Sequence, residues 1–341
     1  MVTKIGLDLG YANIAVSDVS LGVHRIPSVA IIDKNTRRVL SVGDDAMMGI
    51  GGENGILVRP FKNGLFYNAE FTESIINYAI KSIHHTDEIR CVVGVPDVTN
   101  QKQEKSLVAM LEKAGVKECF FVKRAIAALV GAGYSPTISA VSVNIGASTT
   151  EIAILHEGEI IHTASAEIGG ESFDEAVRKY MREQGELNIS LYDARAIKEA
   201  IGAVWDGRCA DPITVSGTLA LTGNKITMSL CSEDILGVFE EPLHKLLQAI
   251  ADSVKKIPID YVEKIFANGI VLSGGGAMLY GLDKMISKIF TIPAKLAKDS
   301  DDCVARGLLL VNTMLPQKMR SNGKNITANI LKYYKNANKN G

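Results

Sequence analysis

Two stretches of the sequence place a polar side chain and a glycine in a turn between two apolar runs. Asp8 and Gly10 lie in the first turn, and Asn144 and Gly146 take the same places in the second. Glycine lets backbone N–H groups approach phosphate oxygens without a Cβ atom in the way. A carboxylate oxygen is a ligand that hydrated Mg²⁺ prefers. The two turns therefore predict two similar halves that face each other around a polyphosphate and its metal ion.

A third glycine-rich turn, Gly274–Gly276, follows an apolar run that ends at Ser273. It predicts a strand, a turn and the start of a helix, whose N-terminus attracts anions. Any one of these turns is typical of an ordinary sheet, but the three in this order favour a nucleotide site. Other phosphate and nucleophile motifs are missing from the sequence, which contains no G-x-x-x-x-G-K-[ST], no G-x-G-x-x-G after a strand and no G-x-S-x-G.

The composition limits the class of protein. The chain has 341 residues, 47% hydrophobic and 22% charged, which excludes wholesale disorder and allows about two domains. The formal net charge of −1 argues against binding nucleic acid by bulk charge. The first strand-like run begins at Thr3, which leaves no room for a signal peptide, and no apolar run approaches the roughly 20 residues that span a bilayer. The five cysteines and six histidines lack metal-ligand spacing, so we expect a cytoplasmic protein with reduced thiols.

Apolar periodicity predicts alternating strands and helices. Residues 71–83 carry apolar side chains at helical spacing, and residues 89–95 form a continuous apolar run before Pro96. Such alternation is typical of an α/β sheet. The other expected elements are a hairpin over 4–16, strands over 27–58, helices over 101–114 and 123–131, a strand over 119–122, a second hairpin over 140–154, a helix over 192–204 and strands over 212–230.

The last segment, Pro316–Gly341, contains six basic and no acidic residues, together with Ile326, Ile330 and Tyr334. We expect a short helix followed by an irregular tail. Such a tail either stays solvated or binds weakly to anionic lipid through its basic and apolar side chains.

Seven motifs together resemble one known family. They are GLDLGYANIAV, VRPFKNG (58–64), VVGVP (92–96), NIGASTTEIAI, IGGESFDEAV (168–177), GIVLSGGGAMLYGL (269–282) and CVARG (303–307). Over about residues 4–315 the chain is similar to MreB, a family of bacterial actins within the actin, sugar kinase and Hsp70 superfamily.

The resemblance implies an α/β actin-like fold of two domains, with four subdomains around a nucleotide cleft. The first lobe would comprise residues 1–141 and 302–320, with a small insertion over about 27–65. The second would comprise residues 142–301, with an insertion over about 180–237, and residues 321–341 would form a basic C-terminal tail.

The same resemblance implies that ATP or ADP binds with Mg²⁺. Asp8 and Asn144 would hold the metal through water, and Thr149 would act beside Arg124 at the hydrolytic position. The residues placed at the nucleotide are Asp8, Gly10, Tyr11, Ala12, Asn13, Gly146, Ala147, Ser148, Thr149, Gly170, Glu171, Lys198, Gly274, Gly275, Gly276 and Met278.

The chain departs from the family at the position that orients the water attacking the γ-phosphate. The family usually reads Glu-Glu-Pro where this chain has Lys123-Arg124-Ala125. Arg124 cannot accept a proton or a hydrogen bond from water, and its positive charge would favour phosphate binding. We therefore expect very slow hydrolysis; the alternative is neutral drift in an active ATPase.

Other departures affect the metal, the phosphate turn and the adenine. Asn144 replaces the usual Asp and should hold Mg²⁺ less firmly. Ala147 and Ser148 replace glycines, and Tyr11 replaces a usual Thr. Of the family's Glu-Ile-Lys run only Lys198 is retained, which either packs over the base or is an ordinary surface lysine.

The resemblance predicts a cytoskeletal filament protein that sets cell shape or moves the cell. Its partners would be further copies of itself, related filament proteins and, weakly, the inner face of the membrane through the basic tail, but not nucleic acid. The departures resemble those expected in a specialised paralogue, such as those of helical wall-less bacteria. One alternative is a small-molecule kinase of the same superfamily, with Asp97 as the base. An Hsp70-like chaperone would need a peptide-binding domain after about residue 315.

Overall fold

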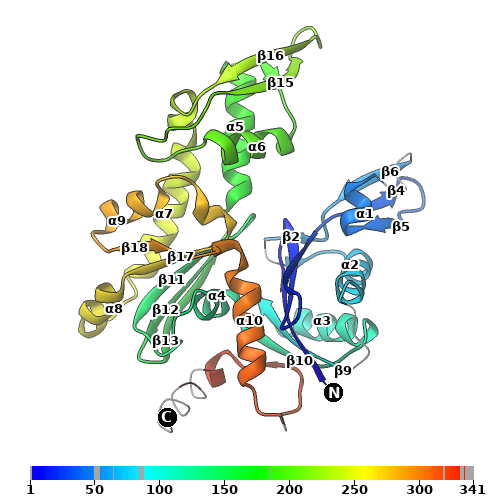
Figure 1. Ribbon diagram of the computed structural model, residues 1–341, viewed down its shortest axis with the longest axis vertical. Coiled ribbons are helices and arrows are strands. Elements are labelled where there is room, and N and C mark those ends of the chain that lie inside the picture. Colours follow the sequence, from blue (N-terminus) through cyan, green and yellow to red (C-terminus); the bar gives the residue numbers. More distant parts are fainter. Residues whose placement is uncertain are drawn as a thin grey trace.

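The computed structural model describes residues 2–49, 54–63, 65–83, 88–184, 186–317, 319–330 and 334. Two sheets dominate the fold, and each is extended by a smaller one (Figure 1). The sequence-based expectation of two related halves is confirmed, because each large sheet contains an antiparallel hairpin whose first strand also pairs with a parallel neighbour.

The first large sheet has six strands in the order β19-β10-β9-β1-β2-β3. Strands β1 to β3 are antiparallel, and β9, β10 and β19 add in parallel. Parallel neighbours need crossover connections, which α2 and α3 provide. The bounds are β1 (Val2–Leu9), β2 (Asn13–Asp18), β3 (Gly22–Pro27), β9 (Glu88–Val95), β10 (Val116–Lys123), β19 (Asn322–Asn325), α2 (Ala69–Lys81) and α3 (Gln101–Lys113).

The second large sheet has five strands in the order β13-β12-β11-β17-β18. Its core is formed by the apolar side chains of β11, β12 and β17 together with those of the surrounding helices. The bounds are β11 (Ala140–Ile145), β12 (Thr150–His156), β13 (Glu159–Ala166), β17 (Ile270–Ser273), β18 (Ala294–Leu296), α7 (Glu240–Val254), α8 (Val262–Asn268) and α9 (Leu282–Phe290).

Two helices, α4 (Arg124–Gly131) and α10 (Cys303–Met314), lie between the two large sheets (Figure 1). Glycines let their backbones approach closely. A Cβ atom on Gly131 would lie 1.8 Å from the carbonyl oxygen of Cys303, and one on Gly307 would lie 1.8 Å from that of Ala127. No larger residue fits at either position, so the close α4–α10 contact depends on both glycines.

Each half carries a small sheet. In the first half, β4, β5 and β6 form it next to α1, and the β7–β8 pair follows. In the second half, β14, β15 and β16 form it beyond α5 and α6. The bounds are β4 (Ala30–Asp33), β5 (Val39–Val42), α1 (Gly43–Met47), β6 (Gly55–Val58), β7 (Phe61–Lys62), β8 (Leu65–Phe66), α5 (Gly170–Gln184), β14 (Leu187–Asn188), α6 (Leu191–Ile201), β15 (Ile213–Leu219) and β16 (Lys225–Leu230).

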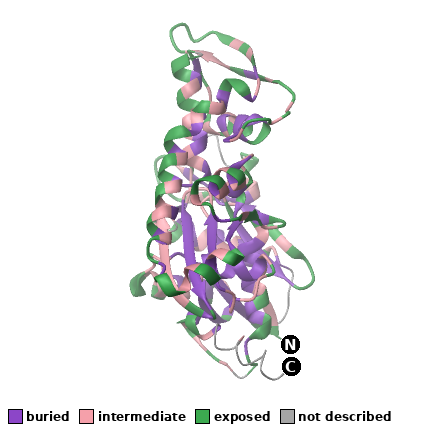
Figure 2. Cartoon of the chain, turned by 90° about the vertical axis from the view of Figure 1, so that its left-hand side faces the viewer, coloured by how far each residue is buried: buried purple, intermediate pink, exposed green. Residues whose placement is uncertain are grey.

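Burial is concentrated in the large sheets, and the small sheet of the second half is more exposed (Figure 2). None of the helices in the described ranges combines the length and the apolar character that crossing a bilayer requires.

Two expected elements differ from the sequence analysis. The residues after Gly274 form only a short 3-10 helix, Gly275–Met278, and α9 begins later. The C-terminal segment forms a strand that the sequence analysis missed, because β19 pairs in parallel with β10 at the sheet edge. Residues 331–333 and 335–341 of the expected tail lie outside the described residues.

After β19 the chain packs into the core between the sheet, α4 and α10. Ile326 is 0% and Ile330 2% exposed, and both contact the cluster that contains Phe120 and Val122. The sequence left these isoleucines either in a solvated tail or at a lipid surface, but the structure buries both in the protein.

We predict that Ile326→Ala lowers the free energy of unfolding by about 2–5 kcal/mol, the usual cost of emptying a buried isoleucine site. Ile259→Ala is the matched control, because Ile259 is 83% exposed. Urea unfolding followed by circular dichroism measures both. Equal stability of Ile326→Ala and the unmodified chain would contradict the burial of the segment after β19.

Candidate functional site

The second predicted turn is fastened to the start of α5. The Gly146 N–H donates to the Thr149 carbonyl oxygen at 2.8 Å, which closes the turn between β11 and β12. The Gly170 N–H donates to the Gly146 carbonyl at 2.9 Å, and the Glu171 N–H donates to the Ala147 carbonyl at 2.8 Å. The turn and the helix N-terminus therefore form one rigid unit, with Ser148 inside the turn.

The third turn lies against the second. Gly274 has φ of 83°, which favours glycine, and a Cβ atom there would lie 2.3 Å from the carbonyl oxygen of Ile145. A Cβ atom on Gly276 would lie 3.2 Å from the carbonyl oxygen of Gly146. Gly275 lies between them, whereas Met278, at the end of the 3-10 helix, is 59% exposed.

Lys198 on α6 is buried and paired. Its Nζ lies 2.5 Å from Asp174 Oδ1 on α5 and donates to the Gly170 carbonyl oxygen at 3.0 Å. Burial raises the pKa of Asp174, and Lys198 opposes that rise. The alternative of an ordinary surface lysine is therefore wrong, and Lys198 holds α6 and α5 together beside the turn that contains Gly146.

Tyr11, in the first predicted turn, contacts the second half. Its hydroxyl donates to the Glu171 carboxylate on α5. The Arg59 guanidinium lies 4.9 Å from the centre of the Tyr11 ring and donates to the Tyr11 carbonyl at 3.1 Å. Burial and Glu171 raise the pKa of Tyr11. Residues from both halves therefore line the cavity of about 770 Å³ at this place, which also borders Phe61 and Ser172.

Ala12 and Asn13 lie toward the neighbouring strand instead. The Ser28 N–H donates to the Ala12 carbonyl at 2.9 Å, and Asn13 is exposed and pairs with Pro27 on β3. Gly10 is required by the tight turn, because a Cβ atom there would lie 2.5 Å from the Asn13 carbonyl oxygen.

Arg124 is the buried cation between the two large sheets, only 6% exposed. Its Nε lies 2.9 Å from Asp8 Oδ1 on β1, in an ion pair that is not an aligned hydrogen bond. Its Nη1 donates to Glu151 Oε1 on β12 at 3.1 Å, and its Nη2 donates to the Leu9 carbonyl oxygen at 2.7 Å. Arg124 therefore links the first turn of one sheet to a strand of the other.

The carboxylates also explain how a cation is tolerated there. Arg124 is the first residue of α4, which has no acidic residue in its first turn, and a helix N-terminus disfavours positive charge. Burial alone would lower the pKa of Arg124, but Glu151 and Asp8 outweigh it and raise that pKa. Burial raises the pKa of Asp8, and raises that of Glu151 to about 7, with Arg124 opposing both shifts.

Lys123, at the end of β10, makes a second connection between the halves. Its Nζ pairs with the Asp97 carboxylate and donates to Thr163 Oγ1 on β13 at 2.8 Å. The Thr163 hydroxyl donates to Asp97 Oδ1 at 2.7 Å. Burial would raise the pKa of Asp97, but Lys123 and Thr163 hold it below its usual value. Asp97, the expected base of the kinase alternative, is therefore committed to these two partners.

The side chains expected to hold Mg²⁺ do not fit that ion. The Asp8 carboxylate faces the Arg124 guanidinium, so a dication beside it would also lie beside a buried cation. Asn144 is a neutral amide whose Oδ1 accepts from Ser273 Oγ at 3.3 Å. Within the described ranges, no group of three or more His, Cys, Asp or Glu residues is arranged to hold a metal.

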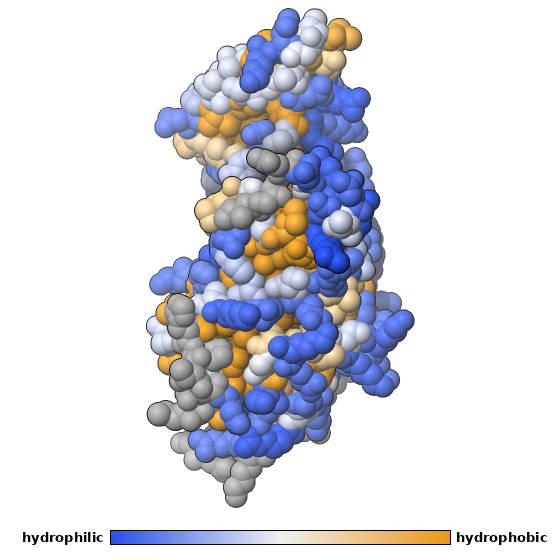
Figure 3. All heavy atoms as spheres, turned by 90° about the vertical axis from the view of Figure 1, so that its right-hand side faces the viewer, coloured by the Kyte–Doolittle hydropathy of each residue, from blue (hydrophilic) through white to orange (hydrophobic). Residues whose placement is uncertain are grey.

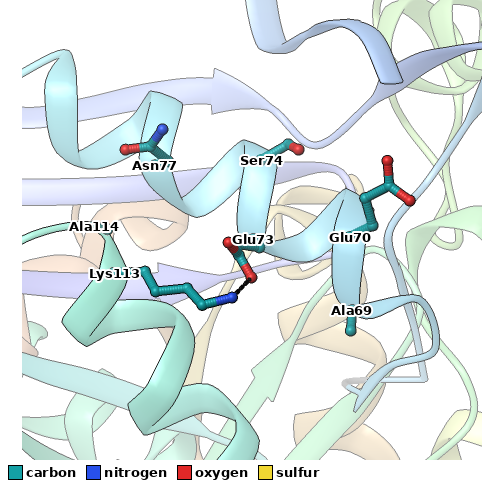
Figure 4. A pocket seen from close by; sticks show the side chains of 7 residues that line it. All are labelled: Ala69, Glu70, Glu73, Ser74, Asn77, Lys113 and Ala114. Carbon is teal, nitrogen blue, oxygen red and sulfur yellow. Dashed lines mark hydrogen bonds and ion pairs between the residues drawn. The ribbon is translucent and has the colours of Figure 1, made fainter. Parts of the chain in front are cut away.

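A separate cavity of about 380 Å³ lies between α2 and α3 (Figure 4). Lys113 Nζ pairs with Glu73 Oε2 at 2.7 Å, and both side chains are solvent-exposed. None of the expected nucleotide-binding residues lines this cavity, so it is not part of the site described above.

Three side chains that organise the site were not predicted as site residues: Glu151, Asp174 and Arg59. Glu151 left a signal, because it is a single charge inside the apolar run TEIAIL. Asp174 and Arg59 left none, since their partners Lys198 and Tyr11 come from distant parts of the chain. Thr149 is 7% exposed and lies immediately before β12, on the same turn as Gly146.

Comparisons with known proteins agree with the motif resemblance. A family model described as MreB/Mbl protein matches residues 2–336. The cell shape-determining protein Mbl of Bacillus cereus is 31% identical over 319 residues, covering 90% of this chain and 96% of the relative. The cell shape-determining protein MreB of Escherichia coli is 31% identical over 316 residues, covering 89% of this chain and 91% of the relative.

Solved structures confirm the expected actin-like fold. A crystal structure of MreB 5 of Spiroplasma citri bound to AMPPNP has a TM-score of 0.85 and 24% identity, covering 91% of this chain and 96% of that one. A MamK double helical filament has a TM-score of 0.80 and 21% identity, covering 93% of this chain and 100% of that one.

We predict that Lys198→Met lowers the free energy of unfolding by about 3–5 kcal/mol, because it leaves the buried Asp174 carboxylate without its cation. Adding Asp174→Asn should recover part of that loss. Lys245→Met is the control, since the Lys245–Glu241 pair is solvent-exposed and should leave the unfolding midpoint unchanged. Guanidinium unfolding checks all three; an unchanged midpoint for Lys198→Met would refute the buried pair.

Proposed function

Because the chain belongs to the MreB/Mbl family of actin-like proteins, we propose that it is a cytoskeletal filament subunit that binds ATP or ADP between its two large sheets. Its filaments would determine cell shape or drive motility through changes of cell helicity. The observation that supports nucleotide binding best is the convergence of the second and third glycine-rich turns with the N-terminus of α5, since Gly146 contacts both α5 and the Gly274–Gly276 turn.

The proposed lobes follow the two large sheets, except that β19 of the first sheet (Asn322–Asn325) lies in the segment 321–341 that was expected to be a tail. Residues 1–141 with 302–320, and residues 142–301, would move as units around the Arg124 and Lys123 contacts. A nucleotide held by both lobes would fix their relative orientation. The names of two solved relatives refer to AMPPNP and ADP complexes, which agrees with this placement.

Self-assembly would use the small sheet of the first half. Apolar side chains are exposed on β5, α1 and β6, and the side of the molecule seen in Figure 3 shows hydrophobic surface within hydrophilic surroundings. These side chains are Leu40 (44% exposed), Met47 (51%), Ile56 (38%) and Leu57 (56%). Further copies of the chain, and related filament proteins, are the proposed partners.

The proposed location is the cytoplasm, including the inner face of the membrane. With Ile326 and Ile330 buried, a weak association with anionic lipid would rest on the basic side chains of the C-terminal segment. Such binding would weaken as the salt concentration rises.

Hydrolysis would be slow, with Thr149 near the phosphate and Arg124 at the hydrolytic position. The Arg124 guanidinium has no lone pair with which to accept a proton from water, and its carboxylate partners are held in ion pairs. The kinase alternative has no support, because Asp97 is paired with Lys123 and Thr163.

We predict that ATP or a non-hydrolysable analogue is sufficient for polymer formation, because assembly would require bound nucleotide but not its cleavage. High-speed sedimentation and negative-stain microscopy with AMPPNP, ATP or no nucleotide measure this. A double substitution in the exposed apolar patch, Met47→Ser with Leu57→Ser, should raise the concentration needed for sedimentation. Failure of the unmodified chain to sediment at any concentration with either nucleotide would contradict the proposal.

We predict that the unmodified chain releases phosphate very slowly and that Arg124→Glu raises the rate by about 10²–10⁴-fold, the usual contribution of a general base. Phosphate release is followed at a saturating ATP concentration, with a thermal melt to verify folding. Lys245→Glu, a substitution in the solvent-exposed pair of α7, is the control and should leave the rate unchanged. Rapid turnover by the unmodified chain would refute slow hydrolysis even if Arg124→Glu does not fold.

A further inference from the structure

We propose that this chain binds its nucleoside triphosphate without a divalent cation, because the Arg124 guanidinium supplies the positive charge between the two lobes. This inference rests on the proposed nucleotide binding and adds the ionic form of the ligand. The contacts that support it are those of Arg124 with Asp8, Glu151 and the Leu9 carbonyl oxygen.

The carboxylates of Asp8 and Glu151 would repel a triphosphate if they were unpaired. Asp8 lies on the first turn, with its side chain 20% exposed, and Glu151 lies on the opposite sheet, with its side chain 4% exposed. Both are within 3.1 Å of Arg124. The guanidinium therefore already reduces the negative charge that a bound metal would otherwise have to neutralise.

Few ligands remain for a metal ion at the two turns. Asn144 lies at the matching position of the second turn, and its oxygen carries no formal charge and accepts from Ser273. Mg²⁺ binds in proteins through one or two carboxylates together with phosphate oxygens and water. With Asp8 paired to Arg124, neither turn offers an unpaired carboxylate, so a divalent ion gains little here.

Arg124 still has N–H groups to offer a ligand. A guanidinium has five N–H groups in one plane. One from Nη1 donates to Glu151 and one from Nη2 to the Leu9 carbonyl, while Nε makes the ion pair with Asp8. The second N–H of Nη1 and that of Nη2 remain for further acceptors. Arginine keeps its charge at every pH at which proteins are folded, and its geometry suits phosphate oxygens. A lysine at this position could not contact both sheets and a ligand in the same way.

The experiment measures the dissociation constant of a fluorescent ATP analogue by anisotropy, below the protein concentration that sediments. Titrations are run in Mg²⁺ and in EDTA with the unmodified chain, Arg124→Gln and the control Lys245→Gln, which changes a solvent-exposed side chain of α7. For the unmodified chain and for Lys245→Gln we expect the binding to weaken by less than about threefold in EDTA. For Arg124→Gln we expect the dissociation constant to rise about tenfold or more in EDTA, which corresponds to about 1.4 kcal/mol of binding free energy.

If the unmodified chain binds the ATP analogue about tenfold or more weakly in EDTA than in Mg²⁺, the inference is overturned and the proposed function stays intact. Binding in neither buffer would instead contradict the proposed function. Equal, cation-independent binding by Arg124→Gln would assign Arg124 a purely structural role and overturn the inference as well. Should Arg124→Gln fail to fold in a thermal melt, the comparison of the two buffers for the unmodified chain still decides.

Discussion

The position of the two large sheets relative to each other depends on one buried charge, the guanidinium of Arg124. Removing a partner from a buried ion pair costs about 3–5 kcal/mol, because the other charge stays buried without compensation. Arg124 contacts Asp8 and the Leu9 carbonyl on β1 and Glu151 on β12. The preceding residue, Lys123, joins Asp97 to Thr163 on β13 in the same way. A single strand–helix junction thus provides two ionic connections between the halves.

The same contacts restrict the chemistry of the site. A carboxylate paired with a guanidinium is a poor ligand for a dication, and Asp97 held by Lys123 is a poor base. The second and third glycine-rich turns meet around Gly146 and are free of such ion pairs. Binding and hydrolysis would therefore be separable, because these turns would still hold phosphate, whereas the side chains that would activate water are either replaced or paired.

The sequence predicted those features that depend on local pattern. The helical spacing over 71–83 corresponds to α2, the apolar run over 89–95 to β9, and the two hairpins to β1–β2 and β11–β12. It did not predict partners from distant segments, such as Asp174 for Lys198 or Glu151 for Arg124, since no periodicity encodes them. Strand β19 was missed because its residues, NGKN, have low strand propensity, and pairing with β10 and burial of Ile326 outweigh that preference.

The choice of arginine rather than lysine at position 124 follows from the number of directions in which the contacts lie. Three different nitrogens of one planar group contact Asp8, Glu151 and the Leu9 carbonyl oxygen. A single ammonium cannot provide three such contacts at fixed positions. Lys198, by contrast, serves two acceptors of the same lobe, the Asp174 carboxylate and the Gly170 carbonyl. A lysine is thus sufficient for the two acceptors beside α5 and α6, whereas the three acceptors on β1 and β12 are met by an arginine. A glutamate at position 124 would place a third negative charge beside Asp8 and Glu151, so the faster hydrolysis expected of Arg124→Glu would be accompanied by weaker cohesion between the lobes.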